Sequence, residues 1–246
     1  QPGHKGGEGC QKGGHGRATR LTPQVMSTMA MALRVVVPPH PLIGHWLAVL
    51  RDRHTPGPLY ASATTELGRW LSYEALRDWL PHRSIQVDSP LATTEAEIVD
   101  GDVPLLALPL LTAGLGLWQG AQAVIPSAQV RHLGLQQQGI RGLDRPIPPR
   151  SGVLVFCATV ATGEGLNQVL DRLAELGVRG DRLRVVTALA SGPGLQLVGE
   201  RHGDLTIYTA GIDPELDGDG QIVPGIGVVA ERLFAGPLLE IAVPTA

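Results

Sequence analysis

Lysine is almost absent from this sequence of 246 residues. Its 20 cationic side chains include two lysines, Lys5 and Lys12, and no lysine follows residue 12. A Schiff-base mechanism and a phosphate loop of the Gly-Lys-Ser/Thr type both require a lysine. The sequence therefore excludes both from residues 21–246, where every cation must be an arginine, a histidine or a bound metal.

Cysteine and long apolar runs are scarce as well. The two cysteines, Cys10 and Cys157, are too few for a disulfide framework or a zinc site, and this usage suits a reducing compartment. The longest apolar stretch, 103–117, is interrupted by Pro109 and is shorter than the roughly 20 residues that cross a bilayer. We therefore expect a cytoplasmic protein with no membrane partner, and we assign no metal-ligating residues.

Charge is divided unevenly along the chain. Residues 1–20 carry four cations and one acid, whereas the remainder carries 16 arginines and 22 acids. A mildly acidic body matches a nucleic-acid backbone poorly, so no nucleic-acid partner is expected. We interpret residues 1–30 as a disordered or non-native basic leader, 31–237 as one domain and 238–246 as a C-terminal tail.

What the sequence does contain is an alternation of apolar strands and amphipathic helices. Hydrophobic residues make up 43% of the chain, and glycine and proline together make up about a fifth. Repeated strand–helix units predict an α/β fold with a doubly wound, mainly parallel sheet. The expected helices are 41–53, 62–79, 114–124, 165–176 and 193–200, and the expected strands are 35–37, 105–111, 130–135, 153–156, 183–190 and 205–209.

One strand–turn–helix junction has the form of a phosphate cradle. The strand 153–156 is followed by Cys157, Ala158, Thr159, Val160, Ala161, Thr162, Gly163, Glu164 and Gly165, after which a helix begins. Glycines permit close backbone approach, Thr162 offers a hydroxyl, and a helix start presents free N–H groups. The alternative is a plain strand-to-helix turn with no ligand.

Several long stretches together resemble the uracil phosphoribosyltransferase family. The stretches are PPHPLIGHWLAVLRDRHTPGPLY, ELGRWLSYEALRDWLP, VPLLALPLLTAGLGL, VLVFCATVATGEGL and IYTAGIDPELDGDGQIVPGIG. The resemblance runs from about residue 37 to residue 236. It implies a type I phosphoribosyltransferase-like sheet with a small hood formed by N- and C-terminal segments.

The resemblance also implies an activity of pyrimidine salvage. Family members join uracil to 5-phosphoribosyl-1-pyrophosphate, assisted by Mg2+, and release UMP and pyrophosphate. They commonly form dimers, so a homo-oligomer is expected. The segment from Cys157 to Gly165 would hold the ribose 5-phosphate. The uracil site would be formed, largely through backbone groups, by Tyr208, Ala210, Ile222, Gly227, Val228 and Val229.

The departures from the family pattern fall mainly on the side of the phosphoribosyl donor. The family's Asp-Pro is Cys157-Ala158 here, and its second cradle glycine is Glu164. Its two arginines on the pyrophosphate side are replaced by Thr112 and Gln137, and an aspartate is replaced by Val228. The candidates to replace the lost guanidinium groups are Arg141, Arg145 and Arg150.

Two hypotheses follow from this pattern. The first is a uracil phosphoribosyltransferase, supported by the retained uracil segments. The second is a catalytically silent relative that binds a nucleotide or pyrimidine as a regulator or partner subunit, supported by the clustered replacements. A run of acids, Asp213, Glu215, Asp217 and Asp219, alternates like a calcium loop but lacks its terminal glutamate, so we interpret it as a surface turn.

Overall fold

A computed structural model of the chain describes residues 32–136 and 139–234. The expected leader, 1–30, and the expected tail, 238–246, lie outside the described residues, as does Gln137. The domain boundaries placed there stay predictions.

A parallel sheet organises the described part of the chain, as predicted. Its strand order is β1-β10-β9-β8-β4-β5, and β11 pairs with β9 beyond the end of β10. Every pairing in this sheet is parallel. The strands are β1 (Arg34–Val36), β4 (Leu105–Pro109), β5 (Gln129–Val130), β8 (Gly152–Val160), β9 (Leu183–Ser191), β10 (Thr206–Thr209) and β11 (Ile212–Asp213).

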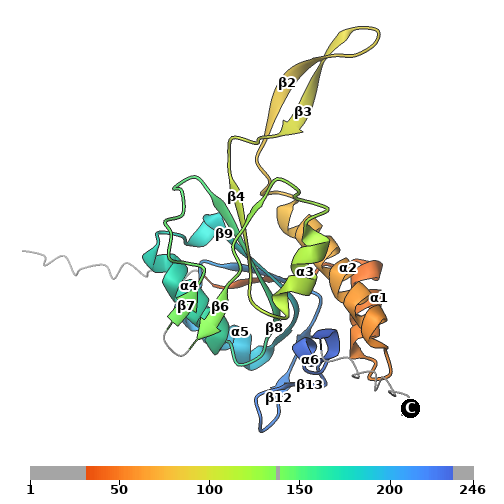
Figure 1. The fold of residues 1–246 in the computed structure, drawn as a ribbon, viewed down its shortest axis with the longest axis vertical. Helices are drawn as coiled ribbons and strands as arrows, with labels where there is room; N and C mark the ends of the chain where they lie inside the picture. Colours follow the sequence, from red (N-terminus) through yellow and green to blue (C-terminus); the bar gives the residue numbers. More distant parts are fainter. Residues whose placement is uncertain (1–31, 137–138, 235–246) are drawn as a thin grey trace, which may run out of the picture. The chain divides into compact units, whose positions relative to one another are not determined.

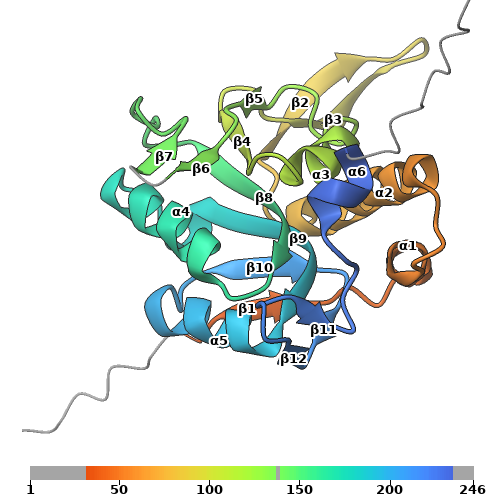
Figure 2. The same cartoon turned by 60° about the horizontal axis from the view of Figure 1, so that its bottom comes forward.

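Helices cover both faces of this sheet (Figure 2). One face carries α1 (Pro41–Arg51), α2 (Gly57–Leu76), α3 (Gly114–Ala121) and α6 (Val229–Phe234); the other carries α4 (Glu164–Glu175) and α5 (Gly192–Arg201). A short 3-10 helix, Gly180–Arg182, precedes β9. No helix in the described ranges is both long and apolar enough to cross a membrane.

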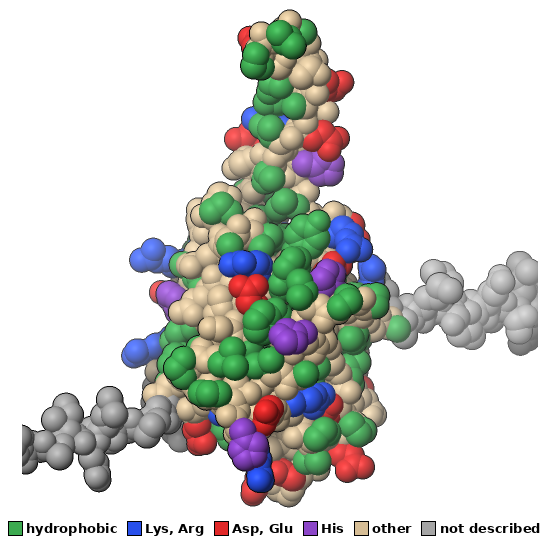
Figure 3. Space-filling model, turned by 90° about the vertical axis from the view of Figure 1, so that its right-hand side faces the viewer, with side chains coloured by type: hydrophobic (Ala, Val, Ile, Leu, Met, Phe, Trp, Pro, Cys, Tyr) green, Lys and Arg blue, Asp and Glu red, His purple; other side chains and the backbone are tan. Residues whose placement is uncertain are grey.

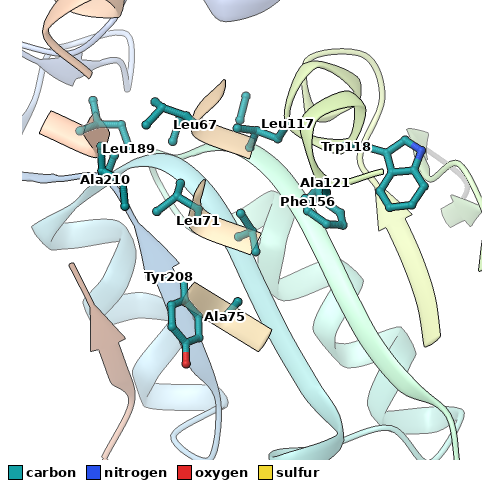
Figure 4. Close-up of a cluster of buried hydrophobic side chains, with 14 of the residues drawn as sticks. Leu67, Leu71, Ala75, Leu117, Trp118, Ala121, Phe156, Leu189, Tyr208 and Ala210 are labelled. Atoms are coloured by element: carbon teal, nitrogen blue, oxygen red, sulfur yellow. The ribbon is translucent and has the colours of Figure 1, made fainter. Parts of the chain in front are cut away.

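Each face of the sheet has its own hydrophobic core. Successive residues of β8 alternate between the two, so that Phe156 packs with α2 and α3 whereas Val155 and Cys157 pack with α4 and α5. Figure 4 shows the first core, in which the Tyr208 side chain lies near Ala75 of α2. Because both faces are buried, β4 and β8 are apolar at almost every position, as is typical of parallel sheets.

Three elements differ from the sequence prediction. Helix α2 begins at Gly57 rather than Ser62, because Pro58 occupies its first turn, where the missing N–H needs no partner. Strands β2 (His82–Asp88) and β3 (Thr93–Val99) form an antiparallel hairpin that was not predicted, and Figure 1 shows it extending from the sheet. Its alternating side chains are mostly exposed, so it lacks a continuous apolar signal.

The segment after β5 also differs. The expected strand 130–135 is divided into β5 and β6 (Gly134–Gln136). The stretch before β8, where no strand was expected, contains β7 (Gly139–Arg141), which pairs with β6. A second small hairpin, β12 (Glu215–Leu216) with β13 (Ile222–Val223), follows β11. Strands of two or three residues are too short for hydrophobic periodicity to reveal.

Glycines bring α2 and α3 into backbone contact. A Cβ atom added to Gly68 would lie 2.0 Å from the carbonyl oxygen of Leu117, and one added to Gly120 would lie 1.7 Å from that of Thr65. Side chains at these positions would force the two helices apart. The close approach fixes α3, and with it the turn between β4 and α3, against the N-terminal helices.

We expect Gly68→Ala to lower the free energy of unfolding by about 3 kcal/mol, because overpacking against backbone cannot be relieved by rotating a side chain. The matched control is Gly44→Ala in α1, where an added Cβ meets no atom within 4 Å. That change should raise stability by about 0.5 to 1 kcal/mol, the helix-propensity gain. Denaturant unfolding measures both, and equal effects would contradict the packing argument.

Candidate functional site

The topology directs attention to the carboxyl ends of β4 and β8. These strands are neighbours, but the chain leaves β4 towards β5 at one edge and leaves β8 towards β9, β10 and β1 at the other. A crevice opens at such a switch point in open parallel sheets, and ligands bind there. The turns that follow β4 and β8 therefore face the same crevice.

The turn after β8 leads directly into α4. Gly163 has a φ of +84°, and an added Cβ would lie 2.6 Å from the carbonyl oxygen of Gly194, so the position requires glycine. Thr162 and Glu164 are exposed beside the first N–H groups of α4, which lack partners within the helix and attract anions. The geometry suits a phosphate, but Glu164 places a carboxylate at the same helix end.

The expected cradle residues 157–160 belong to β8, which continues to Val160 instead of ending at residue 156. Cys157 is 3% exposed within the core on the α4 and α5 face. Burial raises the pKa of its thiol to about 12, against a weaker opposite effect of the Thr187 side chain, so the thiol is neutral. Ala158 and Val160 are buried as well, and only Thr159 is partly exposed.

A cavity of about 100 Å³ joins the end of β8 to the segment after β12. Its lining residues are Thr159, Ala161, Gln221, Ile222, Ile226, Gly227 and Val228. The structure thus brings two residues of the expected phosphate segment together with three of the expected uracil residues. None of the lining side chains is charged, so the cavity suits a neutral ligand.

The other expected uracil residues do not line this cavity. Tyr208 and Ala210 are buried in the core on the α2 face, and Val229 is buried at the start of α6. Burial also raises the pKa of the Tyr208 hydroxyl. Sequence reasoning omitted Gln221, which does line the cavity, although it lies inside the stretch that carried the resemblance.

The residues expected on the pyrophosphate side are only partly described. Thr112 is exposed in the turn after β4, where its carbonyl accepts from the Leu115 N–H, whereas Gln137 lies outside the described ranges. Arg141 is exposed on β7, and Arg145 lies in the loop beyond it. Arg150 precedes the start of β8. At 3.3 Å per residue, the strand places it about 25 Å from the carboxyl end where the site lies. Arg150 is therefore excluded as a replacement for a lost family arginine.

Arg232 of α6 fastens the cavity segment to the N-terminal helices. Its guanidinium donates to the carbonyl oxygens of Leu50 at 2.6 Å, Asp52 at 2.8 Å and Ile226 at 3.2 Å. It also lies 4.0 Å from the ring centroid of Tyr60, whose hydroxyl donates to the same Ile226 oxygen at 3.2 Å. These contacts build the expected hood from N- and C-terminal segments.

Asp213 is a buried anchor and not part of a surface turn. It is 4% exposed, and Arg51 donates to its two carboxylate oxygens at 2.6 and 2.8 Å. The Gly225 N–H donates to it at 2.9 Å, and Arg51 also donates to the Gly225 carbonyl at 3.1 Å. The Arg51 hydrogen bond, opposed by burial and aided by Gly225, holds the pKa of Asp213 below its usual value.

The donor set does not fit a metal ion held by the protein alone. The cavity has no carboxylate or histidine in its lining, whereas Mg2+ requires oxygen ligands that usually include one or two carboxylates. Across the described ranges, no three histidine, cysteine, aspartate or glutamate residues are grouped so that they could bind a metal ion.

Comparisons with known proteins agree on one family. The family model described as uracil phosphoribosyltransferase matches residues 37–236. A uracil phosphoribosyltransferase of Synechococcus elongatus is 45% identical over 217 residues, covering 85% of this chain and 100% of that protein. The chloroplastic uracil phosphoribosyltransferase of Arabidopsis thaliana is 36% identical over 208 residues, covering 81% of this chain and 70% of that protein.

A solved structure has the same fold. The AQ2163 protein from Aquifex aeolicus matches with a TM-score of 0.71 at 28% identity, over 82% of this chain and 98% of that chain. The match therefore extends over most of the chain and is not confined to a phosphate-binding motif.

We expect Asp213→Asn to lower the free energy of unfolding by about 1.5 to 3 kcal/mol at pH 7, the range for hydrogen bonds to charged groups. Because the pKa of Asp213 is lowered in the folded state, its contribution is complete above the unfolded value of about 3.9. It is lost as pH falls towards the folded value. Denaturant unfolding between pH 7 and pH 3 should show the difference between wild type and variant shrinking below about pH 4.

The control for this prediction is Asp102→Asn, since the Asp102 side chain is 80% exposed and lies 4.0 Å from Arg83. It should change stability little at any pH. A difference between wild type and Asp213→Asn that did not vary with pH would contradict the ion pair as its source.

Proposed function

Because the chain belongs to the uracil phosphoribosyltransferase family, we propose that it transfers a phosphoribosyl group from 5-phosphoribosyl-1-pyrophosphate to uracil. The bond from the ribose carbon to pyrophosphate breaks, a uracil ring nitrogen gives up its proton and bonds to that carbon, and UMP, pyrophosphate and a proton result. The observation that carries this proposal is the cavity shared by the end of β8 and the segment 221–228. A base in that cavity would lie beside a phosphate on the turn before α4.

The acceptor side suits a small neutral base. A cavity of about 100 Å³ has the volume of about three water molecules, and its apolar and amide side chains offer no countercharge. Peptide groups of Ile222–Val223 and of residues 226–228 would supply the hydrogen bonds to the base edge. Such recognition depends on where the backbone is held more than on the side chains it carries.

The donor side has fewer charges than the family pattern, and the β6–β7 hairpin, which carries Arg141, is the segment that we propose to lie beside it. A Cβ added to Gly165 near the start of α4 would lie 3.1 Å from Leu135 of β6. Leu135 pairs with Ile140, the residue before Arg141. The β6–β7 hairpin therefore lies against the end of α4 where the phosphate would bind.

Magnesium enters the proposal only as the counter-ion of the donor's diphosphate. Charge on the leaving pyrophosphate must be neutralised, and the described lining residues provide no carboxylate for a resident ion. This chain would accordingly bind the metal through its substrate. The groups available to position that substrate are the backbone N–H groups of the turn 161–165 and the side-chain hydroxyl of Thr162.

We also propose a homodimer formed through the outer face of α1 and α2. Three large apolar side chains on these helices are exposed, namely Leu42, Leu59 and Tyr73. Figure 3, which looks onto the side where α1 and α2 lie in Figure 1, shows apolar and histidine side chains gathered there. Exposed apolar side chains grouped on one side of a molecule are typical of an interface. A cytoplasmic location is proposed as well, supported by the buried free thiol of Cys157.

The proposed function is tested by incubating the protein with uracil, the donor and Mg2+. UMP formation is monitored through the pyrophosphate that the reaction releases. We expect activity with uracil and at least about a hundredfold lower kcat/KM with orotate, because an unpaired carboxylate is costly to bury in a neutral cavity. If both substrates bind by calorimetry but no UMP forms, the chain is instead the catalytically silent relative.

We expect Glu164→Gln to lower KM for the phosphoribosyl donor by about two- to fivefold at low salt, the effect of one charge at a helix N-terminus. The matched control is Glu175→Gln, which makes the same change in net charge at the opposite end of the same helix. Equal effects of the two changes would show that only the overall charge of the protein matters.

A further inference from the structure

We propose that Arg51 and Asp213 are positioning residues that hold the base-facing segment 222–228 in its binding conformation. The role attributed to that segment rests on the proposed function. Neither side chain lines the cavity, so both act through the backbone that does. Sequence reasoning gave Arg51 no role and placed Asp213 in a surface turn.

The segment has little regular structure of its own to fix it. Within it, only Ile222 and Val223 form a strand, which pairs with the two residues of β12. The next fixed point is Gly225, whose N–H and carbonyl are both bound, the first by Asp213 and the second by Arg51. Ile226, Gly227 and Val228, which line the cavity, come directly after it.

The ion pair connects this segment to the sheet. Asp213 ends β11 and is in register with Ser191, the last residue of β9. The Ser191 hydroxyl donates to the Ala161 carbonyl at 2.5 Å and accepts from the Gly194 N–H at 2.8 Å. Ala161 lines the same cavity from the phosphate side. The base-facing and phosphate-facing walls are therefore held to one strand end.

Only arginine can make all three contacts of residue 51. Its planar guanidinium binds the two carboxylate oxygens of Asp213 and, through Nη1, the Gly225 carbonyl. A lysine retains the charge but lacks this fork. In a lysine variant, which cannot make these paired contacts, the segment 222–228 would be less ordered before binding. Ordering it when the base binds costs conformational entropy, and that cost reduces the affinity for the base.

The experiment compares Arg51→Lys and Asp213→Asn with wild type by three measurements. UMP affinity reports the base side, donor affinity reports the phosphate side, and amide hydrogen exchange reports the order of residues 222–228. We expect UMP affinity to fall about tenfold, donor affinity to stay within twofold, and exchange in the segment to rise. KM for uracil should rise more than kcat falls. The matched control is Arg53→Lys, an exposed arginine beside α1 whose guanidinium contacts only His54 among the described residues.

The outcomes separate positioning from general stability. A purely structural role would reduce the folded fraction, lowering kcat and leaving both affinities per folded molecule unchanged. That result, or an equal loss of UMP and donor affinity, would overturn the proposal. If wild type forms UMP but neither variant differs from Arg53→Lys, the positioning role fails while the proposed function stands. If wild type forms no UMP and binds neither substrate, the proposed function fails, whatever the exchange shows.

Discussion

The geometry of the cavity depends on one buried carboxylate. Asp213 connects three parts of the structure. It lies at the end of β11, binds Arg51 of α1, and accepts a hydrogen bond from the Gly225 N–H. Burying a carboxylate is costly unless it is fully hydrogen-bonded and paired. The hydrogen bonds that compensate for the burial of the Asp213 carboxylate also hold the cavity wall in place. The stability of the fold and the geometry of the cavity therefore depend on the same contacts.

The replaced residues have different structural consequences at their different positions. The change at Cys157 puts a neutral side chain into a core, where a thiol packs as a small hydrophobe. Val228 lines the cavity and makes it neutral, whereas Thr112 and Glu164 are exposed at the crevice edge and leave the fold untouched. Against the family pattern that the resemblance implies, these positions therefore change the charge of the donor side without disturbing the sheet that orients it.

Long apolar strands and amphipathic helices were predictable because burial imposes a pattern on consecutive residues. The parallel sheet, α4 and α5 followed from that pattern, and the resemblance identified the family. The β2–β3 hairpin was not predicted because most of its side chains are exposed. Arg51 and Asp213 could not be paired from sequence, since 162 positions separate them and a single ion pair has no periodicity. The end of β8 was placed too early because the pairing of Val160 with Ala190 depends on the neighbouring strand.

The two halves of the site differ in how they tolerate sequence change. On the base side, the wall is backbone held by Arg51 and Arg232, so lining side chains can vary while the peptide groups stay in place. On the donor side, an oligo-anion must be met by charges on exposed side chains, each of which is lost by one substitution. A chain that keeps its fold will therefore preserve base geometry longer than donor charge. The replacements that the resemblance implies on the donor side fit this difference, and they do not by themselves indicate a lost activity.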